Sequence, residues 1–461
     1  MKYKKSQIRS IFLIISTLFF SIILVYSFAG GDGSLGNPYQ IENCTQLQNM
    51  SSNLAANYTL NNDIDCNVPP YNTGSGFNPI GNCTGFCTSG GNDFPFTGNF
   101  NGANYEIQNL YINRSTIDGV GLFAYTTNGI ISEVRLTNVN IKGNLQVGGL
   151  VGSNNNTIFN SSITGTINGS NNMIGGLTGS NYLGGKINYS SSSANVYGFI
   201  MVGGLIGYKG NGEINNSYAT GNIYGTDRVG GLIGWNYYGN TENSYATGNI
   251  YGSDYVGGLV GYNKFNTINR SYATGNVNGN DRVGGMVGYT YWSNIDNSYA
   301  TGSVNGINYV GGILGSVSGT LKNSYATGSV NGSDYVGGLS GHNGGNIGNS
   351  YSVGFVTGST NTGGLLGADV SVVTSSYWDN ETSNQTTSAA GTGRSTADMF
   401  LQSTFSGWDN SLWIFTNTSY PQLAWAYVPA ASPSFLSLFP AQSYISIIIT
   451  SILLLGIFIF N

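Results

Sequence analysis

Small and apolar side chains alternate with polar ones in short runs along the middle of the chain. Between residues 217 and 223 the two sets fall on opposite parities: Ser217, Ala219, Gly221 and Ile223 on one, and Tyr218, Thr220 and Asn222 on the other. Alternation by two indicates β-strands. Residues 209–212 and 225–227 predict turns, because Gly and Asn tolerate left-handed backbone angles. The pattern therefore predicts short strands separated by tight turns.

A unit of this kind repeats along the chain. Equivalent apolar positions recur every 26 to 28 residues, at Leu122, Leu150, Leu177, Leu205, Leu232, Leu259, Met286, Ile313, Leu339 and Leu365. A fixed period of this length indicates stacked repeats, because one unit cannot bury its apolar face alone. We therefore predict an all-β, right-handed parallel β-solenoid of about ten rungs. With strands roughly 4.8 Å apart, ten rungs make a rod about 50 Å long.

The parity of the repeat also predicts which side chains point inward. In one rung these are Ile214, Ala219, Ile223 and Val229, with either Leu232 or Ile233. The Gly-Gly pair after the valine leaves the parity beyond it open. Stacking further requires Ile223, Ile250 and Val277 to form a single column.

Both ends of the chain are apolar. Residues 1–29 begin with four basic residues, continue with an apolar run and end in small residues, which is typical of a secretion signal. An uncleaved anchor is the alternative. Residues 441–460 hold an uncharged run just long enough to span a membrane, and residues 428–440, with three prolines, predict a spacer. The sequence thus predicts a single-pass membrane protein on the extracellular face of the cell membrane.

Two atypical sections flank the repeats, which span residues 121–367. Residues 30–120 predict an N-terminal cap with a short helix over residues 46–54. Residues 368–427 predict a compact C-terminal cap that covers the last rung, because they hold tryptophans at positions 408, 413 and 425.

All four cysteines lie in the N-terminal cap. An even number of cysteines in an exported chain indicates disulfide bonds. We predict the pairs Cys44–Cys66 and Cys83–Cys87, because each closes a short loop. The alternative is a metal site, although Cys83 and Cys87 have no second close pair and no nearby histidine.

The composition restricts the function. Charged residues make up 8 % of the chain, against roughly 25 % in ordinary soluble domains, and the net charge is −5. With no basic patch, we expect no nucleic-acid partner. The chain has 71 glycines and one histidine, and we expect neither a cofactor nor a catalytic site.

The repeated blocks resemble a known family. Val256-Gly-Gly-Leu-Val-Gly-Tyr262 and its partner Ser271-Tyr-Ala-Thr-Gly-Asn-Val277 are similar to the GLUG motif of bacterial and archaeal surface proteins. The flanking segments at 36–41 and 377–383 also resemble those around such repeats. The resemblance covers roughly residues 33–425 and implies an adhesin-like protein or part of a large secreted protein, some of which are peptidases with catalytic domains outside the repeats. The four cysteines lie outside the family pattern.

An acidic column is one candidate site. Asp227, Asp254 and Asp281 each lie two residues before the valine of their rung, as does Asp334. Stacked carboxylates repel one another unless a cation intervenes, and Ca²⁺ takes oxygen ligands. The alternatives are neutralisation by the adjacent Arg228 and Arg282, or a simple turn role.

An aromatic column is the second candidate. Its members recur at the outward parity: Tyr218, Tyr245, Tyr272, Tyr299, Tyr325 and Tyr351, continued by Tyr377. Tyr208, Trp235, Tyr262 and Tyr289 form another. Such rows bind sugars or proteins, because each ring has an apolar face and a polar tip. They also stabilise neighbouring strands, and the two roles are compatible.

Sequons for N-linked glycosylation are frequent, and we interpret the chain as a glycoprotein. They begin at Asn43, Asn49, Asn57, Asn82, Asn113, Asn155, Asn160, Asn168, Asn188, Asn215, Asn269, Asn331, Asn380, Asn384 and Asn417.

Export, anchor and repeats together predict a non-catalytic adhesion or envelope protein whose ligand is a glycan or a protein. The alternatives are a carbohydrate-active β-helix, that is, a polysaccharide lyase or hydrolase, and a pure spacer in the cell coat. His342 stands where other rungs have Tyr or Trp, so we interpret it as a surface substitution rather than a base.

Overall fold

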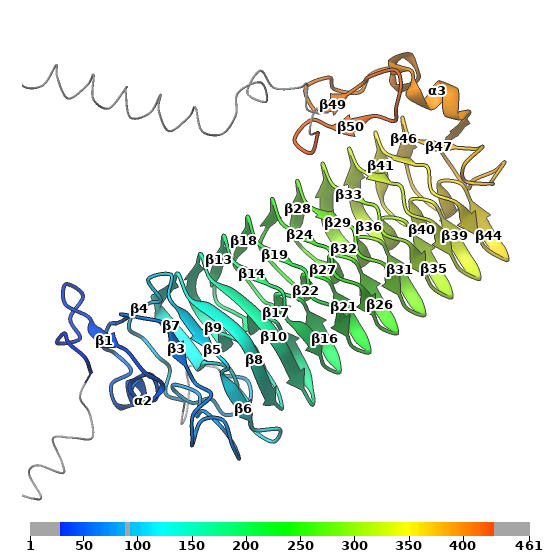
Figure 1. Ribbon diagram of the computed structural model, residues 1–461. Coiled ribbons are helices and arrows are strands. Elements are labelled where there is room, and N and C mark those ends of the chain that lie inside the picture. Colours follow the sequence, from blue (N-terminus) through cyan, green and yellow to red (C-terminus); the bar gives the residue numbers. More distant parts are fainter. Residues whose placement is uncertain (1–27, 88–92, 428–461) are drawn as a thin grey trace, which may run out of the picture.

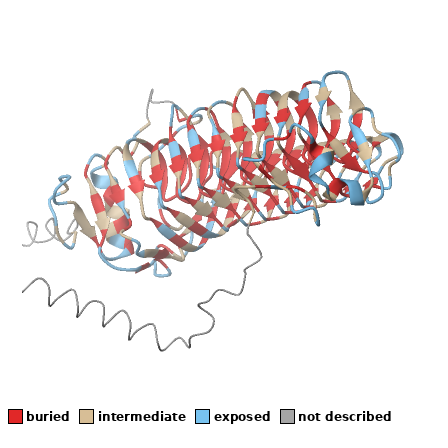
Figure 2. Cartoon of the chain, turned by 90° about the horizontal axis from the view of Figure 1, so that it is seen from above, coloured by how far each residue is buried: buried red, intermediate tan, exposed pale blue. Residues whose placement is uncertain are grey.

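The computed structural model describes residues 28–87 and 93–427. In this part of the chain, successive turns of backbone stack along one axis into an elongated rod (Figure 1). The prediction of a parallel β-solenoid of about ten turns is confirmed. Buried residues occur on the strands along the whole length of the rod (Figure 2).

A single rung shows how the chain winds. Its strands are β17 (Ile206–Lys209), β18 (Glu213–Asn215), β19 (Tyr218–Ala219), β20 (Ile223–Tyr224) and β21 (Asp227–Gly230). The next rung repeats them as β22 (Ile233–Asn236), β23 (Thr241–Glu242), β24 (Tyr245–Ala246), β25 (Ile250–Tyr251) and β26 (Asp254–Gly257). Each strand pairs in parallel with its equivalent in the neighbouring rung, as β20 does with β25. The turn expected at residues 209–212 begins one residue late, because Lys209 ends β17.

Three parallel sheets therefore run along the rod. One contains β17 and β18, and the second contains β19 and β20. The third contains β11 (Asn172–Gly175), β16 (Ile200–Gly203), β21, β26, β31 (Asp281–Gly284), β35 (Asn308–Gly311), β39 (Asp334–Gly337) and β44 (Thr360–Gly363). We call the outer side of the second sheet the tyrosine face.

The predicted inward column is present. Ile223 is in register with Ile250, Ile250 with Val277, and all three are fully buried. Either Leu232 or Ile233 was expected to point inward, and both are fully buried. The reason lies in the Gly-Gly corner before them, where a Cβ on Gly231 would collide with the carbonyl oxygen of Gly258 in the next rung. The backbone turns there so closely that consecutive residues can both face the core.

The Asn-Ser pair that opens each Ser-Tyr-Ala-Thr block forms a second corner. Asn243 has a φ of 49°, a left-handed conformation that Asn tolerates better than most residues. The Ser244 hydroxyl accepts the N–H of Ser217 in the preceding rung at 3.2 Å and donates to the carbonyl of Glu242 at 2.8 Å. A buried serine at this position thus satisfies backbone groups that the bend takes out of the strand ladder.

A buried polar column runs beside the apolar core. It contains Asn154, Asn181, Lys209, Asn236 and Asn263, all fully buried and in register. The amides bond from rung to rung, as Asn236 Nδ2 does to Asn263 Oδ1 at 2.8 Å. The Lys209 amine takes the place of one amide and donates to Asn236 Oδ1 at 3.0 Å and to the carbonyls of Tyr238 and Gly239 at 2.6 and 2.7 Å.

The solenoid begins inside the expected N-terminal cap. β1 (Tyr39–Ile41), β2 (Tyr58–Leu60), β4 (Phe100–Asn101) and β7 (Phe123–Ser132) already pair in parallel. The predicted short helix is present as α2 (Cys44–Asn49) followed by the 3₁₀ helix η1 (Met50–Ser52). Disulfides join Cys44 to Cys66 and Cys83 to Cys87, the predicted pairs.

The C-terminal cap lies in a different place from the one expected. Trp378, in β47 (Tyr377–Asp379), and β48 (Thr392–Arg394) close the last rung. The elements that follow, α3 (Thr396–Phe400), the 3₁₀ helix η2 (Gln402–Phe405), β49 (Trp413–Ile414) and β50 (Gln422–Leu423), fold back along the side of the rod, in orange in Figure 1. The prediction that the tryptophans of this cap cover the end of the solenoid is therefore wrong.

The predicted spacer and membrane anchor lie outside the described residues, as does nearly all of the predicted secretion signal. Within the described residues, no helix has the length and apolar character needed to cross a membrane.

The buried lysine generates a prediction about pH. Burial lowers the pKa of Lys209 to about 7, from its usual value of about 10.5. Between these values the unfolded chain binds a proton that the folded chain lacks, so stability rises with pH across this window and is lowest below pH 7. Lys209→Asn, which restores the amide column, should stabilise the protein most at pH 6, with the gain shrinking by about 1 kcal/mol per pH unit above pH 7.

Urea denaturation of both proteins from pH 6 to 10 measures this difference. The tyrosines contribute equally to both proteins, so the comparison isolates Lys209. Stability curves that stay parallel across the range would show that the amine keeps its proton when buried.

Candidate functional site

The predicted tyrosine column forms an unbroken stack on the tyrosine face. Neighbouring rings from Tyr218 to Tyr351 lie nearly parallel, with centroids 4.7 to 5.1 Å apart. The parallel register of β19, β24 and their equivalents sets this spacing, because each tyrosine pairs directly with the next. The column is therefore a direct consequence of the repeat.

The stack limits how these rings can bind a ligand. Each inner ring has both faces covered by its neighbours, so it offers only its edge and its hydroxyl to a partner. Apolar sugar faces pack on aromatic faces, and those are occupied here. The open part of the column consequently presents a row of phenol hydroxyls rather than a stacking platform.

The C-terminal cap covers the far half of this column. Trp413 lies 6.1 Å from the Tyr325 ring and 6.0 Å from the Tyr351 ring, and Tyr351 donates its hydroxyl to the carbonyl of Pro421 at 2.6 Å. Only 9 % of Tyr325 and 1 % of Tyr351 remain exposed. These two residues were predicted to bind a ligand, and that prediction is wrong because the cap already occupies their edges.

The cap also reaches back toward the middle of the rod. Trp425 lies 5.8 Å from the Tyr299 ring and 6.4 Å from the Tyr272 ring, and its indole N–H donates to the carbonyl of Asn297. What stays uncovered is the part of the column formed by Tyr218 and Tyr245, with Tyr272 at its margin. We call these three residues the open tyrosine column.

A second column on the same face was missed in the sequence. Tyr197, Tyr224 and Tyr251 stack with centroids 4.8 and 5.0 Å apart, and Tyr197 and Tyr251 are 38 % and 40 % exposed. Both columns lie at outward parity in rungs that the cap leaves open. The sequence does contain the pattern that predicts this column, because each of these tyrosines directly follows a Val or Ile that points inward.

The acidic column lies where the strands of the third sheet begin, because each Asp is the first residue of its strand. Asp227 pairs in register with Asp254 and Asp254 with Asp281. Arg228 forms an ion pair with Asp227 at 2.6 Å, and Arg282 forms one with Asp281. Burial raises the pKa of Asp227 and of Asp281, and the neighbouring guanidinium offsets part of that rise in each case.

Aromatic rings hold the two arginines in place. The Arg228 guanidinium lies 5.0 Å from the Trp235 ring, and Arg282 lies 5.2 Å from the rings of both Tyr255 and Tyr309. Cations in this position are attracted by the ring faces. In the described part of the chain, no three His, Cys, Asp or Glu side chains gather into a group that could hold a metal ion. The three predicted metal ligands are thus in register, with Asp227 and Asp281 paired to arginines and the exposed Asp254 between them.

His342 lies at the register position of Tyr289, two rungs further along, with Ser316 between them. Its ring meets the edges of Tyr309 and Tyr335 at 6.0 and 6.4 Å, and its Nδ1 lies 3.4 Å from the Ser316 hydroxyl. Burial lowers the pKa of His342, with Asp369 opposing the change. The imidazole thus packs against two tyrosines of the third sheet, while its register neighbours are Ser316 and Ala368.

The chain matches known proteins in three comparisons. The family model of the GLUG motif matches residues 200–224, 225–251 and 279–305. Halomucin of Haloquadratum walsbyi is 37 % identical over 147 residues, which is 30 % of this chain and 2 % of halomucin. A protein of Evansella cellulosilytica described as a Gly-rich membrane protein is 36 % identical over 142 residues, which is 30 % of this chain and 15 % of that protein. The matches therefore span a small part of either relative.

One solved structure is also similar. It is a Bacteroides ovatus protein described as an immunoglobulin A1 protease, 18 % identical, with a TM-score of 0.35 over 87 % of this chain and 96 % of the other.

The contact between cap and column generates a prediction. Trp413→Ala should release the cap from the side of the rod, because Trp413 is 1 % exposed and packs on two tyrosines. Removing such a side chain costs about 3 to 5 kcal/mol. Limited proteolysis should then cleave residues 396–427 much faster, while the repeats stay intact. Trp292→Ala, at a position that is 68 % exposed, is the control, and equal cleavage of both variants would contradict the prediction.

Proposed function

Because this chain carries repeats of the GLUG motif, we propose that it is a membrane-anchored β-solenoid of the cell surface that attaches to other surfaces without catalysing a reaction. The rod presents the tyrosine face outside the cell. Its ligand is a glycan or a protein of another cell or of the envelope.

The observation that carries this proposal is the repetition of identical side chains in register on the outside of the rod. Tyr218, Tyr245 and Tyr272 recur at one rung spacing, each followed two residues later by the exposed Thr220, Thr247 or Thr274. A ligand with its own repeat can touch several rungs at once. Contacts that are weak singly then add up to firm attachment.

The relatives support a location at the cell surface. One of them is described as a membrane protein, and its similarity to this chain extends over 142 residues. The secretion signal and the C-terminal anchor predicted from the sequence agree with that location.

The chemistry of the ionisable groups supports binding rather than catalysis. Asp227 and Asp281 are held by arginines, and His342 is packed among aromatic rings. An acid–base pair for polysaccharide cleavage would need two carboxylates free to exchange protons. These three groups are engaged in contacts that stabilise the rod.

Attachment and turnover can be measured together. Liposomes that carry the full-length chain should adhere to immobilised envelope polysaccharide or to cells, and the polysaccharide should keep its length. An increase in reducing ends or in unsaturated sugars would overturn the non-catalytic proposal in favour of a carbohydrate-active β-helix.

A set of conservative variants separates adhesion from a spacer role. Replacing all three residues of the open tyrosine column by Phe removes the hydroxyls and keeps the stack. Adhesion should fall on the order of 100-fold, because each of the three lost hydrogen bonds contributes roughly 1 kcal/mol. Tyr299→Phe with Tyr325→Phe, under the cap, is the matched control and should adhere normally. Full adhesion by the first variant would identify the rod as a spacer.

A further inference from the structure

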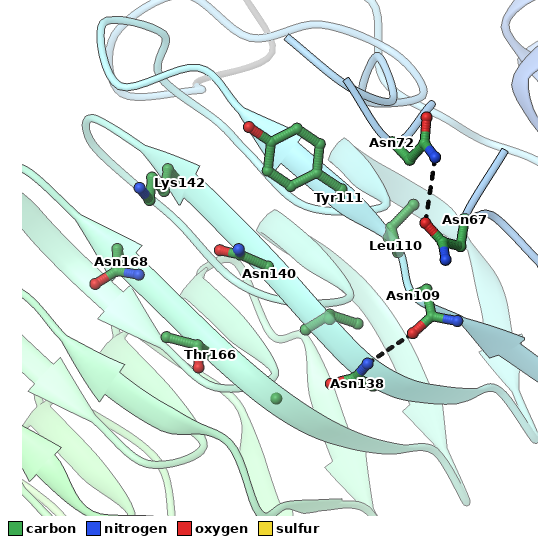
Figure 3. Close-up of a pocket in the computed structure, with 12 residues that line it drawn as sticks. Asn67, Asn72, Asn109, Leu110, Tyr111, Asn138, Asn140, Lys142, Thr166 and Asn168 are labelled. Atoms are coloured by element: carbon green, nitrogen blue, oxygen red, sulfur yellow. Dashed lines mark hydrogen bonds between the residues drawn. The ribbon is translucent and has the colours of Figure 1, made fainter. Parts of the chain in front are cut away.

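A polar cleft opens on the tyrosine face at the N-terminal end of the rod (Figure 3). Its volume is about 650 Å³, within the range of small-ligand sites. Six asparagines line it, Asn67, Asn72, Asn109, Asn138, Asn140 and Asn168. We call it the amide cleft.

Three neighbouring rungs form the floor of the amide cleft. The strands are β6 (Tyr111–Asn113), β8 (Arg135–Gly143) and β10 (Ser162–Gly169), which pair in parallel. Tyr111, Asn140 and Thr166 form one row across them, and Lys142 and Asn168 belong to the next. Three rungs extend over two strand spacings, or roughly 10 Å.

The loop at residues 67–72 forms the wall. It starts directly after the disulfide of Cys66 and ends beside Tyr71, whose buried ring lies 6.0 Å from Phe77. Within it, Asn72 Nδ2 donates to Asn67 Oδ1 at 3.2 Å. The wall is therefore anchored at both ends and holds its asparagines toward the floor.

The lining has a distinctive chemistry. A carboxamide offers both donors and acceptors, which matches sugar hydroxyls, since each of these also donates and accepts. Asn72 Oδ1 is shielded from water and accepts no hydrogen bond from the described residues. No carboxylate lines the cleft, and Lys142, which is exposed, forms no ion pair with any residue in the described ranges. The cleft thus combines amides with one uncompensated cation.

We propose that the amide cleft binds an anionic polysaccharide, with the hydroxyls of adjacent sugars on the asparagine amides and an acidic group of the sugar on Lys142. This inference rests on the proposed adhesion function and identifies its ligand class. A longer polysaccharide would extend beyond the cleft along the rod. The row that contains Lys142 and Asn168 continues in register to Tyr197 and Tyr224. The second tyrosine column and the amide cleft then belong to one track.

Binding of three probes to the full-length chain in liposomes tests this assignment. The probes are an oligogalacturonide, dextran sulfate of matched length, and neutral dextran. Both anionic probes should bind at least about 10-fold more tightly than dextran, and raised salt should weaken them. Equal binding of all three, or of none, would overturn the proposal.

Matched variants locate the site. Lys142→Gln should lower affinity for the anionic probes about 10-fold, while Lys322→Gln, an exposed lysine on another sheet, should leave it unchanged. Asn140→Ala should weaken binding of all probes, in contrast to Asn305→Ala, an exposed asparagine far along the same face. Thermal unfolding confirms that the variants fold. Equal losses from the two lysines would indicate attraction to net charge and contradict a specific cleft.

The same variants separate this inference from the proposed function. If the chain binds no probe but liposomes still adhere through the open tyrosine column, the amide cleft is not the site and adhesion stands. If the probes bind at the cleft but adhesion to cells is absent, the cleft stands and the adhesion proposal fails.

Discussion

The structure depends on hydrogen bonds between each turn of backbone and the next. A rung contains strands as short as two residues, such as β20 and β25, which could not persist alone. They are stable because each inner rung is paired on both sides and buries its Ile or Val against the equivalent residue in its neighbours. This requirement explains the near-identity of the repeats. A side chain that fits one rung must also fit above and below itself, as the amides of Asn236 and Asn263 do.

The same register also shapes what the rod offers to a partner. Identical residues fall into columns, and the two tyrosine columns of the tyrosine face stack face to face at the strand spacing. Stacking stabilises the rod but covers the ring faces, so the proposed recognition of a ligand would use ring edges, hydroxyls and amides. Where the repeat is least regular, at the N-terminal rungs, an added loop makes a concave surface. Regular rungs repeat the same surface groups along the rod, whereas the irregular N-terminal rungs form the amide cleft.

Much of this could be predicted from the sequence, because a solenoid converts sequence period into spatial neighbours. The core column of Ile223, Ile250 and Val277 followed directly from the spacing. The position of the C-terminal cap did not, because Trp408, Trp413 and Trp425 have no period to place them in register with a rung. The same holds for the loop at residues 67–72. The burial of Lys209 was not predicted for a different reason. The glycines around it indicated a turn, although its position in the repeat places it in a buried column.

The cap divides the tyrosine face into a covered part and an open part. A solenoid needs its last rung closed, and Trp378 with β48 does so without the rest of residues 396–427. The remaining elements instead cover the tyrosines at the C-terminal end of the column. They do so with five large apolar residues: Met399, Phe405, Trp408, Trp413 and Leu423. Those tyrosines would otherwise present the same edges as the open ones. In the proposed function, the binding groups therefore lie on the N-terminal and middle rungs, which are farther along the chain from the predicted membrane anchor than the covered rungs are.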